Sequence, residues 1–430
     1  MQRLAETGGP GIFRDPLTYK AEEIACLELA DAPVPHPTAK RELIYSREAT
    51  RAYVILVSST LYPEVPPVVV KLFAITSRHS RPAQASRELL EDSEVEVRYL
   101  KILSMMVMAH GGADACALAV GYRILTRQQV EACGYMPDDR SLFAEDRRRS
   151  RSTGQYALII AEAGDSSVTT LTTSLLRERG LSSYEMTYQL ASVCFQLCHL
   201  LAVVHTRFPS FRHNDLHCSN LLVQNIPVRA LRRSLGLPDA TPLVVEYCFG
   251  DRRWQVNLDR APFRVLLWDL AYSSISGEDA EAAGLLRVVP RVRECGSAAI
   301  VSKTSKNTYV DIFKFIDTLR WVADSSVDAS VMAKLAPDLL DFLRTDVAPP
   351  DLQYAAMDST KQREAVRDRQ LRVHARADML GCPSPTSLLL THPLFSRLFE
   401  MSAGAKRPKP AYRLGLTGLQ RDASPPPLSE

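Results

Sequence analysis

Alternating apolar and polar positions predict a sheet in the first part of the chain. Three segments rich in β-branched and aromatic residues follow one another, Leu43–Tyr45, Ala52–Val57 and Val68–Phe73, and a fourth, Tyr156–Ala161, comes later. The third segment contains one charged residue, Lys71, between apolar neighbours. We expect this lysine to be largely buried, and a buried cation needs a partner of opposite charge.

A helix is predicted between these strands, over residues 87–108. Glu96, Leu100 and Leu103 occur at i, i+4 and i+7, which places them on one helical face. Glu96 is therefore the preferred partner of Lys71. Glu94 is the alternative, and either carboxylate could instead belong to a solvated face.

The second half of the chain has the periodicity of helices. Ser182 and Glu185 have the spacing of a capping box. Apolar residues follow it at the helical period, at Met186, Leu190, Val193, Leu197, Leu200 and Val204. A further buried helix is predicted around Asp311, and another has Ser384 at its N-cap and Pro385 at N1.

The segment Phe211–Val223, directly after the long helix, contains a candidate site. A phosphotransferase loop needs an Asp that takes the proton of a hydroxyl substrate and, five residues on, an Asn that binds a metal ion on the nucleotide phosphates. Asp215 and Asn220 have this spacing. His213, Asp215 and His217 fit a metal-hydrolase site equally well, and a polar loop without chemistry is a third interpretation of the motif alone.

Other candidate residues occur in the order that a phosphotransferase needs. Lys71 and Glu96 precede the loop, and an apolar strand beginning at Arg264 ends at Asp269, where a second metal ligand is required. Four such features rarely fall in the right order on the right element types by accident.

With these motifs, the chain resembles protein kinases, and in its details it resembles the haspin-type atypical kinases. His217 stands where the usual loop has Lys, and Leu158–Gly164 is similar to the haspin hinge strand. Asp269-Leu-Ala271 replaces Asp-Phe-Gly. The resemblance covers roughly residues 42–400. It departs from the kinase pattern at Ser46–Arg51, which contains no glycine where a glycine-rich phosphate loop is expected.

The resemblance implies an α+β, bilobal protein-kinase-like fold, with a small antiparallel-sheet N-lobe and a larger, mainly helical C-lobe. The expected divisions are an N-terminal extension at 1–40, the N-lobe at 41–163, the C-lobe at 164–402 with an insertion at 224–262, and a disordered, basic and Pro-rich tail at 403–430. Within the insertion, Cys248–Asp251 predicts a turn between two strands.

The same resemblance implies an ATP-dependent protein serine/threonine kinase with ATP and Mg²⁺ as cofactors. Lys71, held by Glu96, would pair the α and β phosphates. Asn220 and Asp269 would hold Mg²⁺, and Asp215 would take the proton of the acceptor hydroxyl.

Two further residues have roles that only the resemblance suggests. Glu162, in the hinge segment, is a candidate nucleotide-binding residue. Asp311 would accept backbone N–H bonds from the catalytic loop. Two alternatives to a protein kinase stay open: small-molecule phosphotransferases share the Asp-Leu-His-x-x-Asn loop, and the missing glycines are compatible with a pseudokinase scaffold.

The composition of the chain agrees with a globular protein and gives no sign of several other classes of protein. The chain has 430 residues, of which 46% are hydrophobic and 23% charged, as in a globular protein. A net charge of +3 does not indicate direct nucleic-acid binding. No segment has the ~20 apolar residues of a membrane span, and the nine Cys include no CxxC pair. We expect a soluble monomer with a protein substrate and no membrane partner, intracellular in the nucleus or cytoplasm, in a host cell if the source is viral.

Overall fold

The structure is a computed structural model that describes the elements around the candidate site. The described residues are 40–47, 52–58, 67–75, 96–100, 102–103, 116–117, 119–132, 155–178, 180–270, 273–275, 310–326, 335–344, 383–399, 412–415 and 418–421. Residues 1–39, the connection 48–51, Glu94 and the Lys406–Lys409 basic run lie outside them, as does most of the chain between Asp269 and Asp311.

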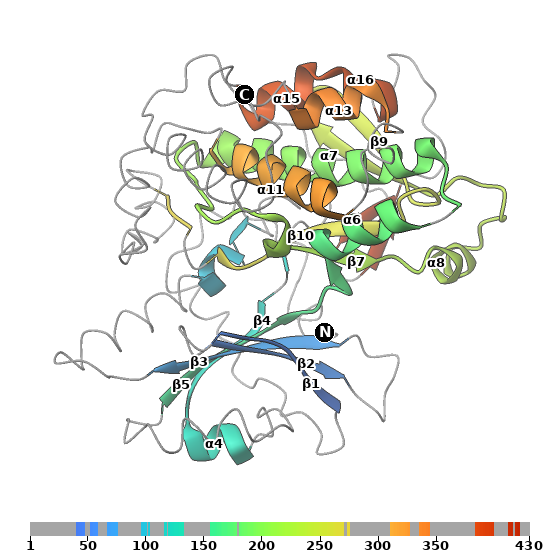
Figure 1. Cartoon of the computed structure of the whole chain (residues 1–430). Helices are drawn as coiled ribbons and strands as arrows, with labels where there is room; N and C mark the ends of the chain where they lie inside the picture. Colours follow the sequence, from blue (N-terminus) through green and yellow to red (C-terminus); the bar gives the residue numbers. More distant parts are fainter. Residues whose placement is uncertain are drawn as a thin grey trace.

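A five-stranded antiparallel sheet forms one end of the protein, at the bottom of Figure 1. Its strands, in chain order, are β1 (Lys40–Arg47), β2 (Ala52–Ser58), β3 (Val68–Ile75), β4 (Ala119–Thr126) and β5 (Gln155–Glu162). The spatial order is β1-β2-β3-β5-β4, so β3 is central. Lys71 on β3 pairs with Val54 on one side and Ile159 on the other, which fixes the lysine in the middle of the sheet. The short helix α4 (Arg127–Ala132) follows β4.

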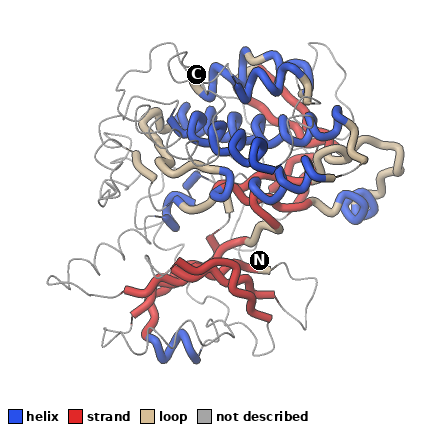
Figure 2. The backbone as a smooth tube through the Cα atoms, in the orientation of Figure 1, coloured by secondary structure: helices blue, strands red, loops and turns tan. Residues whose placement is uncertain are grey.

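Helices make up most of the larger end, as Figure 2 shows in blue. They are α6 (Val168–Arg177), α7 (Ser183–Arg207), α8 (Val228–Ser234), α11 (Val310–Ser326), α13 (Pro337–Arg344), α15 (Pro385–Thr391) and α16 (Pro393–Leu398). The expected caps are present: Ser182 and Glu185 form a capping box on α7, and Ser384 caps α15 with Pro385 at its first position. The α+β class predicted from the sequence is confirmed.

Helix α7 is the centre of the hydrophobic core. It is long and apolar enough to span a membrane by composition, but 94% of that segment is buried inside the protein, as expected for a core helix. Phe195 on α7 is fully buried and contacts the rings of Tyr247, Trp254, Phe395 and Phe399. The packing of β8, β9 and the C-terminal helices on α7 holds the start of the following loop in place.

Two small sheets complete the larger end. The first has the order β10-β7-β6, with β6 (Ser166–Ser167), β7 (Leu221–Asn225) and β10 (Phe263–Leu267). The second has the order β12-β11-β8-β9, with β8 (Val244–Phe249), β9 (Arg252–Asn257), β11 (Tyr412–Gly415) and β12 (Gly418–Arg421). The predicted turn at Cys248–Asp251 joins β8 to β9, and Gly250 adopts a φ of 56° there, which glycine tolerates without strain.

The last of these strands differ from the expectation for the tail. Residues 403–430 are predicted to be disordered, yet they contain the antiparallel pair β11–β12. β11 meets β8 in parallel through Tyr412 and Val245. An edge strand has N–H and C=O groups that are unpaired within its own sheet, so the edge of β8 offers a pairing partner to β11. The composition of the tail alone does not predict this pairing.

Candidate active site

The site is built on the segment that follows α7. The chain turns at Asn214, whose φ is 64°, a left-handed conformation that Asn adopts more readily than most residues. The single helical turn η2 (Cys218–Asn220) then leads into β7. Asp215 and Asn220 therefore lie at the two ends of one short loop, and the amide nitrogen of Asn220 donates to the carbonyl oxygen of Asp215.

Asp311 on α11 holds the first half of this loop. Its carboxylate is fully buried and accepts the backbone N–H of His213 at 2.7 Å and that of Asn214 at 2.9 Å. Hydrogen bonds from backbone N–H groups to a carboxylate are among the stronger kinds in proteins. This contact agrees with the structural role expected for Asp311.

His213 is engaged at both ring nitrogens. Its Nε2 lies 3.0 Å from the carbonyl oxygen of Trp268, and its Nδ1 lies 3.3 Å from the backbone N–H of Asp215. The tautomer with a proton on Nε2 satisfies both contacts. In this tautomer Nε2 carries the proton and the lone pair of Nδ1 accepts a hydrogen bond, so neither nitrogen is free to bind a metal ion. In addition, the described residues contain no group of three or more His, Cys, Asp or Glu side chains placed to hold a metal ion. The geometry therefore disfavours the metal-hydrolase interpretation.

Asp215 is half-buried and has three polar neighbours. Its Oδ1 lies 2.6 Å from the Nζ of Lys314, and its Oδ2 lies 3.5 Å from the Nδ2 of Asn220. The Nε2 of His217 is 3.7 Å from the same Oδ2. Burial is the main cause that lowers the pKa of His217. The negative charge of Asp215 raises this pKa, and the positive charge of Lys314 lowers it, so the net pKa is below its ordinary value. Burial and the charge of Lys314 therefore favour the neutral form of His217 beside the carboxylate.

Lys71 connects the two ends of the protein. Its Nζ lies 2.8 and 2.9 Å from the two carboxylate oxygens of Glu96, and 2.5 Å from Oδ1 of Asp269. Lys71 is 5% exposed and Glu96 is fully buried. Residues 96–100 and 102–103 are helical, so the helix register predicted from Leu100 and Leu103 places Glu96 against the lysine.

Charge attraction outweighs burial at this lysine. Burial alone lowers the pKa of Lys71, but the carboxylates of Asp269 and Glu96 together raise the pKa above its ordinary value. At Asp269, burial raises the pKa, and the attraction and hydrogen bond of Lys71 reverse this effect and leave the pKa below its ordinary value. Both groups are charged at neutral pH, as a site for phosphate and metal requires.

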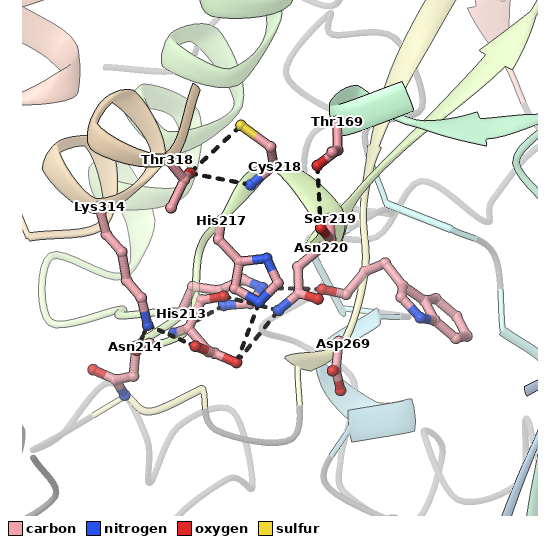
Figure 3. A network of polar contacts seen from close by, with 12 residues as sticks. Thr169, His213, Asn214, His217, Cys218, Ser219, Asn220, Asp269, Lys314 and Thr318 are labelled. Carbon is pink, nitrogen blue, oxygen red and sulfur yellow. Dashed lines mark hydrogen bonds and ion pairs between the residues drawn. The ribbon is translucent and has the colours of Figure 1, made fainter. Parts of the chain in front are cut away.

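Asp269 occupies an unusual backbone position. It lies just past β10, and its φ is 58°. Non-glycine residues in this region cost free energy and cluster at functional sites. The backbone N–H of Trp268 donates to the carbonyl of Asn220 at 3.0 Å, which brings the end of β10 beside the loop. The structure thus places Asp269 and Asn220 next to each other from distant parts of the chain (Figure 3).

The donor set fits a hard divalent cation. Mg²⁺ prefers oxygen ligands such as carboxylates and amide carbonyls. The Nδ2 of Asn220 donates to the carbonyl of Asp215 at 2.8 Å, an orientation that leaves the amide oxygen of Asn220 available as a ligand. Asp269 uses Oδ1 toward Lys71 and has its second oxygen for a cation. These two residues would hold the metal, which would neutralise phosphate charge when bound.

Glu162 has a different environment from the other candidates. Its carboxylate forms an ion pair with Arg264 and accepts a hydrogen bond from Nε2 of Gln224 at 2.9 Å. The carboxylate thus ties the end of β5 to β7 and β10. The next turn is tightly packed, since a Cβ on Gly164 would lie 2.7 Å from the Cβ of Leu222. A side chain here would push the connection between the two ends of the protein outward.

The sequence interpretation missed Lys314. Asp311, Lys314 and Thr318 occur at i, i+3 and i+7 on α11, and all three contact the loop. This spacing places the three polar residues on one face of the helix. Because Asp311 was expected to bind the loop, the same spacing could have predicted that Lys314 also contacts it. Arg264 and Gln224 were missed as well, and no sequence pattern pairs them with Glu162.

The sequence is similar in part to a curated viral protein. A protein of Acanthamoeba polyphaga mimivirus named "Putative serine/threonine-protein kinase R400" is 22% identical to this chain over 249 residues. That match points to a protein-kinase-like chain. It covers 52% of this chain, and the chain spans about half the length of the relative, 45%. No family model matches the sequence.

Proposed function

We propose that this chain is an ATP-dependent protein serine/threonine kinase with a bilobal, haspin-like fold. The observation that carries the proposal is the position of Lys71 on β3, where it pairs with Glu96 of the helical segment 96–100 and with Asp269 in the helical end. The loop residue Asn220 lies next to the end of β10 that carries Asp269, and its amide nitrogen contacts Asp215. A cation, two oxygen ligands for metal and a half-buried carboxylate are the groups that phosphoryl transfer requires.

In the proposed reaction, one bond forms and one bond breaks at the γ-phosphorus, and Asp215 is the residue that accepts the proton. The hydroxyl oxygen of a Ser or Thr side chain forms a bond to the γ-phosphorus of ATP. The bond between that phosphorus and the β–γ bridging oxygen breaks, and ADP leaves with the electron pair. The hydroxyl proton passes to the carboxylate of Asp215. Lys71 would bind the α and β phosphates, and Asn220 and Asp269 would hold Mg²⁺.

Positioning and charge account for most of the catalysis in this proposal. The Lys314 and Asn220 contacts orient the carboxylate of Asp215, and Asp311 fixes the backbone under it. The described loop offers the same chemistry to a small-molecule hydroxyl. The experiment below therefore includes both kinds of acceptor.

The first test is phosphotransfer by the Asp215→Asn variant. The wild-type protein is incubated with labelled ATP, Mg²⁺ and a panel of protein and small-molecule acceptors. The substitution keeps the shape of the side chain but removes the proton acceptor, so turnover should fall by about 10²- to 10⁴-fold. MgATP affinity should stay within a few-fold, because Lys71, Asn220 and Asp269 are unchanged.

Each alternative predicts another result. Unchanged turnover in Asp215→Asn would end the kinase proposal. Transfer to small molecules alone would reassign the substrate class, and MgATP binding without transfer by the wild type would indicate a scaffold.

A further inference from the structure

Lys314 places a positive charge beside the catalytic loop from outside it. The residue lies on α11, one turn after Asp311, and its side chain reaches down to the loop (Figure 3). Its Nζ lies 2.6 Å from Oδ1 of Asp215 and 3.2 Å from the carbonyl oxygen of Asn214. The side chain is 16% exposed, against 31% for Asp215. The ammonium group is therefore held at the surface of the site and not in the core.

The geometry leaves this ammonium group able to bind a ligand. A lysine has three N–H donors, and two are directed at Asp215 and Asn214. Among the described residues, the third has no protein partner. Since the carboxylate that it touches is the proposed proton acceptor, the group lies next to the place where the acceptor hydroxyl and the transferred phosphoryl group would meet.

No residue of the loop itself supplies this charge. His217 on the loop lies 3.7 Å from Asp215, a longer separation than the 2.6 Å of Lys314, and its burial lowers its pKa and favours the uncharged ring. Lys71 contacts Glu96 and Asp269, so its charge is placed at a different part of the site. The cation beside Asp215 comes instead from α11, a helix about 100 residues away in sequence.

We propose that Lys314 binds the terminal phosphoryl group of the nucleotide and, through its contact with Asp215, aligns the proton-accepting carboxylate. This inference rests on the proposed function. Negative charge on the phosphoryl oxygens would be stabilised by a cation that is already in place, which is the usual source of a large catalytic effect. Lys314 neither gains nor loses a proton in the step.

The test compares two nucleotides on the Lys314→Met variant of the full chain. MgATP carries the terminal phosphoryl group and MgADP does not, so the variant should lose several-fold affinity for MgATP and keep its affinity for MgADP. The turnover number should fall by about 10²- to 10³-fold, as for loss of one preorganised donor. Lys314→Arg retains the charge and should recover part of both losses.

A matched control lies on the same helix. Arg320 pairs with Asp324 on α11, about two turns after Lys314. Arg320→Met removes a cation of α11 in the same way and should leave turnover and both nucleotide affinities unchanged. If Lys314→Met unfolds, the comparison is made with Lys314→Arg and Lys314→Gln, each checked by thermal unfolding.

The outcomes separate this inference from the proposed function. Turnover within threefold of wild type in Lys314→Met overturns the inference alone. Equal losses of MgATP and MgADP affinity also overturn it, because they indicate a structural role. If the wild type transfers phosphate to no acceptor, the proposed function fails, and the affinity ratio of the two nucleotides still decides the role of Lys314. Failure of the wild type to bind either nucleotide overturns both.

Discussion

Two histidines of α7 lie in the core as neutral rings. His199 is 1% exposed, and its Nε2 lies 3.0 Å from the carbonyl oxygen of Cys248. His205 is 8% exposed, and its Nε2 lies 3.2 Å from the carbonyl of Phe211, where the loop begins. Burial is the main cause that lowers the pKa of each from 6.5 to about 4. Protonation of these two histidines in acid therefore disfavours the folded core that positions the loop.

We expect the protein to lose stability as the pH falls from about 6.5 toward about 4. The unfolded chain binds a proton at His199 below its ordinary pKa of 6.5, whereas the folded chain resists it until about 4, so acid favours unfolding. At about pH 5.5, the cost is about 1.4 kcal/mol for each histidine. His199→Gln keeps a donor for Cys248 but does not titrate. It should lose less of its free energy of unfolding than wild type between about pH 7.5 and about pH 5.5, measured by urea denaturation. Equal losses in the two proteins would show that His199 does not contribute.

A buried ion pair joins Lys71 on β3 to Glu96 on the helical segment 96–100. Lys71 keeps Asp269 as a partner if Glu96 is replaced, whereas Glu96 loses the ammonium group if Lys71 is replaced. Removing one partner of a buried pair leaves an uncompensated charge, which costs about 3–5 kcal/mol. The two single substitutions should therefore have unequal effects on stability.

A double-mutant cycle tests this asymmetry. Lys71→Met should lower the free energy of unfolding by about 3–5 kcal/mol, and Glu96→Gln should lower it by less. The double variant should be more stable than Lys71→Met alone, because the buried carboxylate of Glu96, which loses the ammonium group in Lys71→Met, is then removed as well. All three are measured by denaturant unfolding. Additive losses would contradict the pair as an energetic unit.

At the scale of the whole molecule, the candidate ligand site lies where the two ends of the protein meet. Lys71 belongs to the sheet end, Asp215, Asn220 and Asp269 belong to the helical end, and Glu96 lies on the helical segment that contacts Lys71. A ligand that contacts both ends binds the folded protein only, so it adds to the free energy of unfolding by mass action. Thermal unfolding therefore reports on binding even before an acceptor is known.

MgATP should stabilise the wild type and not the Asp269→Ala variant. At a ligand concentration about 100 times the Kd, the gain is about 2.7 kcal/mol, and ATP without Mg²⁺ should give a smaller shift. The comparison is made with each variant's own ligand-free melting temperature, which removes the effect of the substitution itself. Equal stabilisation of both proteins by MgATP would show that Asp269 is not a metal ligand.

The sequence by itself determined the elements and most of the candidate residues. Strand and helix periodicity, the Ser182 and Ser384 caps and the turn at Gly250 are local features, and local physics fixes them. The spacing of Asp215 and Asn220 and the helical face of Glu96 are local as well. Each of these needs only a few neighbouring residues to be recognised.

Only the tertiary structure decided which distant groups meet. The contacts of Lys71 with Asp269 and of Lys314 with Asp215 span 198 and 99 residues, and they depend on how whole elements pack. The same holds for the pairing of Glu162 with Arg264, for the lowered pKa of His217 and for the tail strand beside β8. Burial and the partners of a charge are properties of the folded core, so a pattern along the chain does not contain them.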